Sequence, residues 1–263
     1  MQPVIKWSGS KKNQAHDIVS YIPDKKYETY YEPFCGGCSV FSYIIEREMC
    51  ANKFNGFVCS DLNGDLIASY NLIKNNPDKA IADYSVHWHN LNVKSNSIED
   101  KKDYFYIVRE RLNAEHDPSD FIFIMRTTTN GMPRYNKNGE FNNSFHITRD
   151  GITPYQFEKI VKRWNLFLNR YDVQFVCQSF EKTIAGENDL MYLDPPYANT
   201  NGMYFGDFDN NALFTFLSQQ KCDWLLSYDG IAGKKNMVAD VPETLYKKHL
   251  LIRNGNSSFR RVI

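Results

Sequence analysis

The sequence lacks the features that mark membrane and secreted proteins. No apolar run is long enough to cross a membrane, and residues 1–6 contain no apolar core of a signal peptide. The six cysteines are scattered over strand-like and loop segments, so we expect reduced thiols rather than a disulfide framework. Cys35 and Cys38 have the spacing of metal ligands, but no second cysteine pair follows. We therefore expect a cytoplasmic protein with no membrane contact and no metal site.

The sequence also has no excess of charge of one sign, because 31 lysines and arginines balance 31 aspartates and glutamates. A zero net charge argues mildly against a nucleic-acid partner. The distribution is more informative, because residues 246–263 contain basic side chains and no acidic one, and Lys6, Lys11 and Lys12 lie close together. These stretches would form one phosphate-binding face if the fold brings them together. Ordinary solvated charge is the alternative.

Hydrophobic periodicity predicts an α/β chain with an insertion. A strand over 27–33, a helix over 39–48 and a strand over 57–61 are typical of a doubly wound sheet. Residues 66–125 have apolar positions at helical spacing, and Asn-Gly within 135–141 predicts a hairpin with a type I′ turn. After residue 152 we expect a helix over 154–168, a strand over 173–177, a strand ending at 193, a helix over 211–219 and a strand over 224–227. The sequence stops at residue 263, a few residues into an expected final strand, which suggests a shortened chain.

The most informative motif is Asp194-Pro195-Pro196-Tyr197, which follows the apolar residues 190–193. The prolines fix φ and have no N–H, so the Asp194 carboxylate and the Pro195 carbonyl can both point outward as acceptors. Two acceptors beside the ring of Tyr197 suit a planar base with an exocyclic amine. A tight turn with a capping aspartate is the alternative.

A second pattern indicates a nucleoside-containing cofactor. Residues 32–39 form a glycine-rich strand-to-helix junction, where the backbone can approach a ligand closely. Asp61 ends the next expected strand, at the distance along the chain where ribose hydroxyls are bound in dinucleotide sites. Its alternative role is an N-cap for a helix starting near Gly64. Residues 5–11 place Trp7 and two lysines around a glycine, which suits an anionic group, although taken alone they favour a solvated tail with a core-packed Trp7.

Taken in order, these motifs resemble the Dam-type, alpha-group DNA adenine-N6 methyltransferases, which use S-adenosylmethionine. The resemblance covers nearly the whole chain and rests on residues 6–11, 32–37, 61–66, 130–136, 139–142 and 194–197. It implies a Rossmann-like α/β methyltransferase domain formed by 1–65 and 151–263. Residues 66–150 would form an inserted, mostly helical DNA-recognition domain carrying a β-hairpin. It further implies a monomer, in a bacterial cell or a phage-infected host, that methylates an adenine flipped out of double-stranded DNA.

The resemblance also implies residue roles. Catalysis would use Asp194, Pro195, Pro196 and Tyr197. Cofactor contacts would come from Trp7, Lys11, Glu32, Pro33, Phe34, Gly36, Asp61, Phe180 and Asp194, with Lys11 neutralising the cofactor carboxylate and Asp61 binding the ribose. DNA contacts would come from Lys6, Asn130, Arg134, Asn136, Lys137 and Arg260. Lys6 and Arg134 would contact guanines at the two ends of a short site, although Arg134 on a phosphate or in a surface salt bridge is an alternative.

The sequence departs from the family pattern at several positions. Ser8, Ser10 and Cys38 stand where alanine, threonine or glycine is common, and we expect these changes to be tolerated. Residues 143–147 lack the Val-Pro-Phe-Gly often found there, and the target that we expect is a short, GATC-like site. Four alternatives stay open: an RNA methyltransferase, a cytosine-N4 methyltransferase, a non-catalytic DNA-binding regulator on the same fold, and a small-molecule or protein methyltransferase, which would not need the hairpin insert. The cytosine enzymes typically have serine in place of Asp194, and a regulator would need neither Asp61 nor Asp194.

Overall fold

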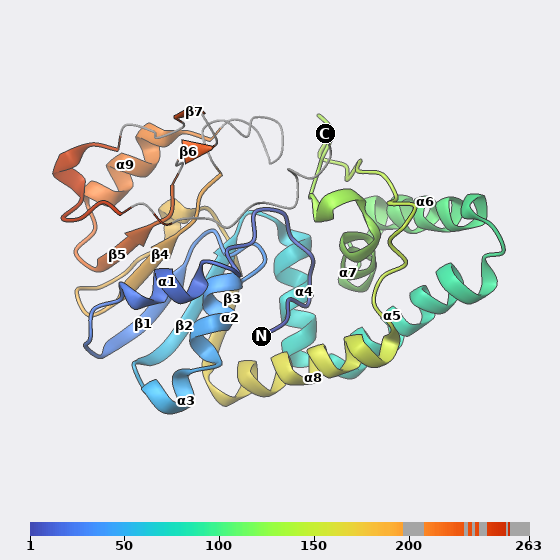
Figure 1. Cartoon of the computed structure of the whole chain (residues 1–263), viewed down its shortest axis with the longest axis horizontal. Helices are drawn as coiled ribbons and strands as arrows, with labels where there is room; N and C mark the ends of the chain where they lie inside the picture. Colours follow the sequence, from blue (N-terminus) through green and yellow to red (C-terminus); the bar gives the residue numbers. More distant parts are fainter. Residues whose placement is uncertain (197–207, 229–230, 233–234, 237–240, 251, 253–263) are drawn as a thin grey trace.

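The main sheet has five parallel strands in the order β3-β2-β1-β4-β5 (Figure 1). The computed structural model describes residues 1–196, 208–228, 231–232, 235–236, 241–250 and 252. The strands are β1 (Tyr27–Glu32), β2 (Phe54–Asp61), β3 (Asp172–Cys177), β4 (Leu190–Leu193) and β5 (Asp223–Leu226), and a short antiparallel pair is formed by β6 (Ile231–Ala232) and β7 (Lys235–Asn236). This parallel sheet with its flanking helices confirms the expected Rossmann-like α/β class.

The residues of strand β4 show that the sheet is covered on both of its faces. All four of its residues are buried. Leu190 and Tyr192 belong to one apolar core, and Met191 and Leu193 belong to a second core on the opposite side. Successive side chains of a strand point to opposite faces, so an uninterrupted apolar run is stable only where helices cover both faces.

The helices of the sheet layers are α1 (Ala15–Ser20), α2 (Ser39–Ile45), α3 (Glu48–Ala51), α4 (Gly64–Asn75), α8 (Pro154–Arg170) and α9 (Asn210–Ser218). An aromatic core joins α4 and α8 to β3, because Tyr70 stacks on Phe175 at 4.8 Å and on Trp164 at 5.7 Å between ring centroids. On the other face, Phe216 of α9 contacts Phe180 edge-on, at 5.3 Å. Phe180 opens the short helix η3 (Phe180–Lys182).

A helical unit interrupts the α/β alternation. It contains α5 (Pro77–His89), the π-helical turn η1 (Asn90–Lys94), α6 (Ile98–Glu115), α7 (Pro118–Thr127) and η2 (Thr129–Gly131). Figure 1 shows α5, α6 and α7 on the far side of α4 from the sheet, whereas α4 packs directly on β3. The division of the chain into catalytic and recognition domains at residues 65 and 150 stays a prediction. No helix in the described part of the chain is long and apolar enough to cross a membrane.

The expected hairpin is present, but its turn differs from the prediction. Tyr135 and Phe141 form an antiparallel bridge, and the N–H of Asn136 donates to the carbonyl of Glu140 at 2.9 Å. A type I′ turn needs positive φ at both central residues, whereas here Gly139 has a φ of +81° and Asn138 is not in that region. The three-residue loop ends in a left-handed glycine instead. The Asn136 side chain favours this geometry, because its oxygen accepts from the N–H of Asn138 and of Glu140.

The order of the strands predicts where a ligand binds at the sheet edge. The chain runs outward from β1 through β2 to β3 and then returns to β4 on the other side of β1. In open α/β sheets, ligands bind outside the carboxyl ends of the strands where the order reverses in this way. Here that point is the carboxyl end of β1 and β4, where Glu32 and Asp194 lie.

Candidate active site

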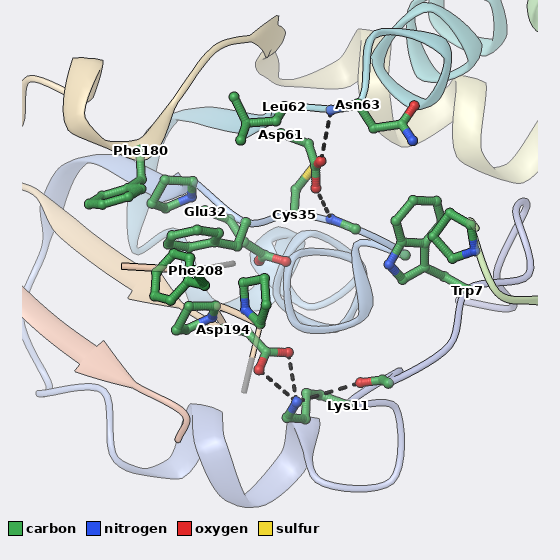
Figure 2. A pocket seen from close by; sticks show the side chains of 18 of the residues that line it. Trp7, Lys11, Glu32, Cys35, Asp61, Leu62, Asn63, Phe180, Asp194 and Phe208 are labelled. Carbon is green, nitrogen blue, oxygen red and sulfur yellow. Dashed lines mark hydrogen bonds and ion pairs between the residues drawn. The ribbon is translucent and has the colours of Figure 1, made fainter. Parts of the chain in front are cut away.

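A cavity of about 400 Å³ opens at the carboxyl ends of β1, β2 and β4 (Figure 2). Its walls contain most of the residues singled out in the sequence. These are Trp7, Lys11, Glu32, Pro33, Phe34, Gly36, Asp61, Phe180, Asp194, Pro195 and Pro196. Residues up to 189 positions apart in sequence, Trp7 and Pro196, thus meet in one place, because each lies near the end of a strand or in the N-terminal arm. Their individual roles stay predictions.

Asp61 is held at the cavity wall by backbone groups of two different loops. Its Oδ2 accepts from the N–H of Gly36 and its Oδ1 from the N–H of Asn63, both at 3.0 Å. Burial raises the pKa of Asp61 to about 6, although these N–H groups oppose the shift. The carboxylate is therefore costly to keep ionised without a ligand. It is suited to accept further hydrogen bonds from hydroxyl groups inside the cavity.

Gly36 allows the glycine-rich loop to approach Trp7 closely while its N–H donates to Asp61. Its φ is +42°, in the left-handed region, and a Cβ placed on it would lie 2.8 Å from Nε1 of Trp7. Any other residue would push Trp7 away or strain the backbone. Cys38 is also left-handed, with a φ of 51°, which explains why glycine suits this position. The cost of a side chain there is about 1–2 kcal/mol, so the substitution is tolerable.

Aromatic and aliphatic side chains form another wall of the cavity. Phe34 and Phe180 stack at 5.2 Å between centroids, and Phe208 contacts Phe34 edge-on, at 5.7 Å. Leu62 lies beside Asp61 on the same cavity and is 58% exposed. An exposed leucine next to a carboxylate and near aromatic rings suits a flat, apolar ring attached to a sugar.

At the other end of the cavity, Lys11 is paired with Asp194 (Figure 2). Lys11 Nζ lies 2.6 Å from Oδ1 and 2.7 Å from Oδ2 of Asp194, and the two side chains are only 10% and 19% exposed. The sequence placed both residues at the cofactor, with Lys11 on the cofactor carboxylate, whereas the structure joins them to each other. This contact favours the ionised carboxylate, which only accepts hydrogen bonds.

Glu32 has a structural task in the described geometry. It is 2% exposed, accepts from the Tyr30 hydroxyl at 2.6 Å and accepts from the N–H of Phe41 in the first turn of α2 at 2.9 Å. Burial holds the pKa of Glu32 well above its usual range. The residue fixes the junction of β1 and α2, and its contact to a cofactor stays a prediction.

The residues expected to bind DNA are only partly brought together. Lys6 lies against the η2 turn, because a Cβ on Gly131 would be 2.7 Å from Lys6 Cγ, and the N–H of Ser8 donates to the Gly131 carbonyl at 2.9 Å. Asn130, next in the chain to Gly131, is half-buried with a φ of 60°. Burial, together with Arg149 and Arg126, lowers the pKa of Lys6. These contacts place Lys6 beside the loop that leads to the hairpin.

On the hairpin, Arg134 and Lys137 are exposed. The Asn136 side chain is engaged in the turn, where it also donates to Glu140 Oε2 at 2.7 Å. Tyr197 and Arg260 lie outside the described residues, as does most of the basic stretch at 246–263. The prediction of one phosphate-binding face is therefore untested.

The cavity wall also contains residues to which the sequence assigned no role, among them Leu62, Asn63, Tyr135 and Phe208. Leu62 and Asn63 directly follow Asp61, so their position along the chain was a usable signal. Tyr135 belongs to the hairpin and Phe208 precedes α9. No local sequence pattern predicts that either side chain would reach a cavity at the sheet edge.

Comparison with known proteins gives a consistent result. Residues 7–253 match the family described as D12 class N6 adenine-specific DNA methyltransferase. The chain is 29% identical over 228 residues to the type II methyltransferase M.CviBI of Paramecium bursaria Chlorella virus NC1A, covering 84% of this chain and 80% of that protein. It is 30% identical over 217 residues to the type II methyltransferase M.MjaIII of Methanocaldococcus jannaschii, covering 76% and 71%. It is 31% identical over 204 residues to the DNA adenine methylase of Escherichia coli K12, covering 74% and 64%.

Proposed function

Because the chain belongs to the D12 class of N6 adenine-specific DNA methyltransferases, we propose that its cavity binds S-adenosylmethionine beside an adenine flipped out of double-stranded DNA. The class makes the protein an enzyme that transfers a methyl group from a donor to N6 of adenine in DNA. The observation that supports the proposal is a single cavity that joins Asp61, on one strand end, to the Lys11–Asp194 pair, at another.

The described residues fit the proposed donor. The Phe34–Phe180 pair and Leu62 suit the adenine ring of the donor, and Asp61 suits the hydroxyl groups of its ribose. A cavity of about 400 Å³ has the size of a small-molecule site. When bound, S-adenosylmethionine supplies an electrophilic methyl group on a positively charged sulfur. The chain contributes orientation, because reacting atoms must be held about 3–3.5 Å apart.

Asp194 and Pro195 act on the acceptor adenine. The lone pair of the adenine amine is delocalised into the ring, so N6 is a poor nucleophile. The Asp194 carboxylate and the Pro195 carbonyl accept hydrogen bonds from the two N6 hydrogens and favour a pyramidal nitrogen. Lys11 contacts both Asp194 oxygens, and an ionised carboxylate offers about four acceptor positions in all. Asp194 takes or relays the proton released from N6.

The adenine reaches this pocket only after leaving the duplex, which costs a few kcal/mol. Stacking on Tyr197 offsets about 1–3 kcal/mol of that cost. Arg134, exposed on the hairpin, pairs with guanine O6 and N7 and contributes about 1–3 kcal/mol of discrimination. Lys6 contacts a second guanine of a short, GATC-like site, and Lys137 contacts phosphate. Residues 66–150 act as the recognition domain of a monomeric enzyme.

The test is tritium transfer from S-adenosylmethionine to unmethylated and methylated duplexes, followed by digestion to nucleosides. We expect N6-methyladenine as the only labelled product, and none on a duplex already methylated at its sites. Sequencing of the modified positions then gives the target. Label that appears only in RNA, or in cytosine, would overturn the proposal.

A further inference from the structure

We propose that Tyr135 is a positioning residue that couples occupancy of the cofactor site to the placement of the recognition hairpin. The inference rests on the function proposed above and assigns a task to a residue for which the sequence predicted no role. The phenol of Tyr135 lines the same cavity as Asp61 and Asp194, although Tyr135 belongs to the hairpin. Its hydroxyl oxygen accepts a hydrogen bond from Nδ2 of Asn63 at 2.6 Å.

Asn63 connects that hydrogen bond to the proposed ribose site. Its N–H donates to Asp61 Oδ1 at 3.0 Å, and its side-chain oxygen caps α4 by accepting from the N–H of Leu66 at 2.9 Å. The second oxygen of Asp61 accepts from Gly36. A continuous series of hydrogen bonds thus runs from the glycine-rich loop through Asp61 and Asn63 to Tyr135. A ligand that binds the Asp61 carboxylate acts on one end of this series.

The other end is the hairpin itself. Tyr135 bridges Phe141 across the hairpin, and their rings meet edge-on at 5.6 Å. Phe141 is fixed to α6, because its N–H donates to Asn113 Oδ1 at 2.7 Å and its carbonyl accepts from Asn113 Nδ2 at 3.2 Å. The base of the hairpin is therefore attached at two points, to α6 through Asn113 and to the turn between β2 and α4 through Asn63.

The alternation of side chains along an extended segment carries the effect to DNA. Tyr135 is half-buried at the cavity, and its neighbour Arg134 is exposed. Successive side chains point to opposite sides, so the rotation that seats Tyr135 against Asn63 also sets the direction of Arg134. A cofactor that orders Asp61 and Asn63 then favours the hairpin position in which Arg134 can contact a base. By linkage, DNA that holds the hairpin tightens cofactor binding by the same factor.

The test measures the dissociation constant of S-adenosylhomocysteine by calorimetry, for the protein alone and for its complex with a duplex that carries the target sequence identified by sequencing the modified positions. The ratio of the two constants is the coupling factor, and in the unaltered protein we expect it to lie well above one. Tyr135→Phe removes the hydroxyl and keeps the ring. We expect the substitution to lower the coupling factor by roughly 2- to 10-fold, the range for loss of one hydrogen bond. We expect KM for DNA to rise while kcat changes little.

Tyr155→Phe is the matched control, because Tyr155 lies exposed at the start of α8 and does not line the cavity. Asn63→Ser keeps a capping oxygen on α4 but is too short to reach Tyr135. If the two residues act as one connection, the double variant Tyr135→Phe, Asn63→Ser loses no more coupling than Asn63→Ser alone. Additive losses, or a coupling factor unchanged in Tyr135→Phe, would overturn the inference while leaving DNA methylation intact. Absence of N6-methyladenine with the unaltered protein would instead refute the proposed function.

Discussion

Two aspartates, Asp120 in the helical unit and Asp61 at the cavity, are withdrawn from water in opposite ways. Asp120 is 2% exposed and fully paired by protein groups. Arg111 donates to both of its oxygens, at 2.6 and 2.5 Å, and His87 Nε2 lies 3.0 Å from Oδ1. Burial would raise the pKa of Asp120, but the hydrogen bonds from Arg111 and His87 outweigh it, and the pKa is lowered. Asp61 has backbone N–H groups but no described cationic partner, and its pKa is raised.

The difference separates a structural carboxylate from one prepared for a ligand. In the helical unit the protein supplies the countercharge, so folding alone satisfies the group. At the cavity the protein supplies only dipoles, and a ligand must complete the set of hydrogen bonds. Asp194 is intermediate, because a lysine of the protein neutralises it, as at Asp120, while both side chains line the cavity, as Asp61 does.

The largest effect is expected at Asp194. Asp194→Asn keeps the shape but loses the charge that accepts from the amine and binds Lys11. We expect methyl transfer to fall by about 10²- to 10⁴-fold, the range for a general acid–base group. The measurement is single-turnover methylation at saturating DNA, with circular dichroism to show that the fold is kept. Activity within a few-fold of the unaltered enzyme would place the chemistry elsewhere.

Removal of Asp120 should affect folding and not ligand binding. Asp120→Ala leaves His87 and Arg111 without their partner, and breaking a fully buried pair costs about 3–5 kcal/mol. Since 44% of the Arg111 side chain is exposed, we expect a loss of about 2–3 kcal/mol in the free energy of unfolding. Urea unfolding measures it, and calorimetry should give unchanged affinity for S-adenosylhomocysteine. A loss of affinity for S-adenosylhomocysteine at constant stability would show that Asp120, like Asp61, acts on ligand binding.

The pH dependence of the two aspartates should have opposite signs. The pKa of Asp61 is about 6 in the folded chain, above its unfolded value, so protonation of Asp61 favours the fold as pH falls. The same protonation removes an acceptor, so cofactor affinity should fall about tenfold per pH unit once pH drops below about 6. Asp120 has a lowered pKa, so its contribution to stability is lost as pH falls through that value.

The pH prediction is checked with calorimetric titrations of S-adenosylhomocysteine across this range, using Asp61→Asn as the variant that should lose the dependence. Unchanged affinity of the unaltered protein below pH 6 would show that the charge of Asp61 is not used in binding.

The smallest effect concerns Cys38, at the edge of the glycine-rich loop. Cys38→Gly relieves a left-handed backbone but removes a buried thiol and adds unfolded-state entropy, so we expect a change in stability within about 1 kcal/mol. Cofactor affinity should stay the same. Thermal unfolding with and without S-adenosylhomocysteine measures both, and a large loss of affinity would show that the thiol itself contributes to the site.

Much of the fold followed from local pattern. The apolar run at β4 and the helical spacing of α8 are dictated by burial on one or both sides, and the sequence carries that information within a few residues. Because strands of a parallel sheet end at one edge, the clustering of Asp61 and Asp194 was also predictable. The pairing of Lys11 with Asp194 was not, since it depends on how the N-terminal arm packs against Gly36 and Gly131. The turn at Gly139 was misassigned, because the Asn136 side chain competes with the pattern that Asn-Gly usually favours.

The N-terminal arm has a consequence for how such an enzyme can diversify. Within six residues, Lys6 lies against the turn before the hairpin, Trp7 against the glycine-rich loop, and Lys11 on Asp194. A substitution in this arm would change target recognition, donor binding and methyl transfer together. We therefore expect few substitutions in the arm to be tolerated. The hairpin tip at 137–140 is exposed and does not line the cavity, so substitutions there should leave donor binding and methyl transfer unchanged. New target preferences, natural or engineered, should therefore arise at the tip first.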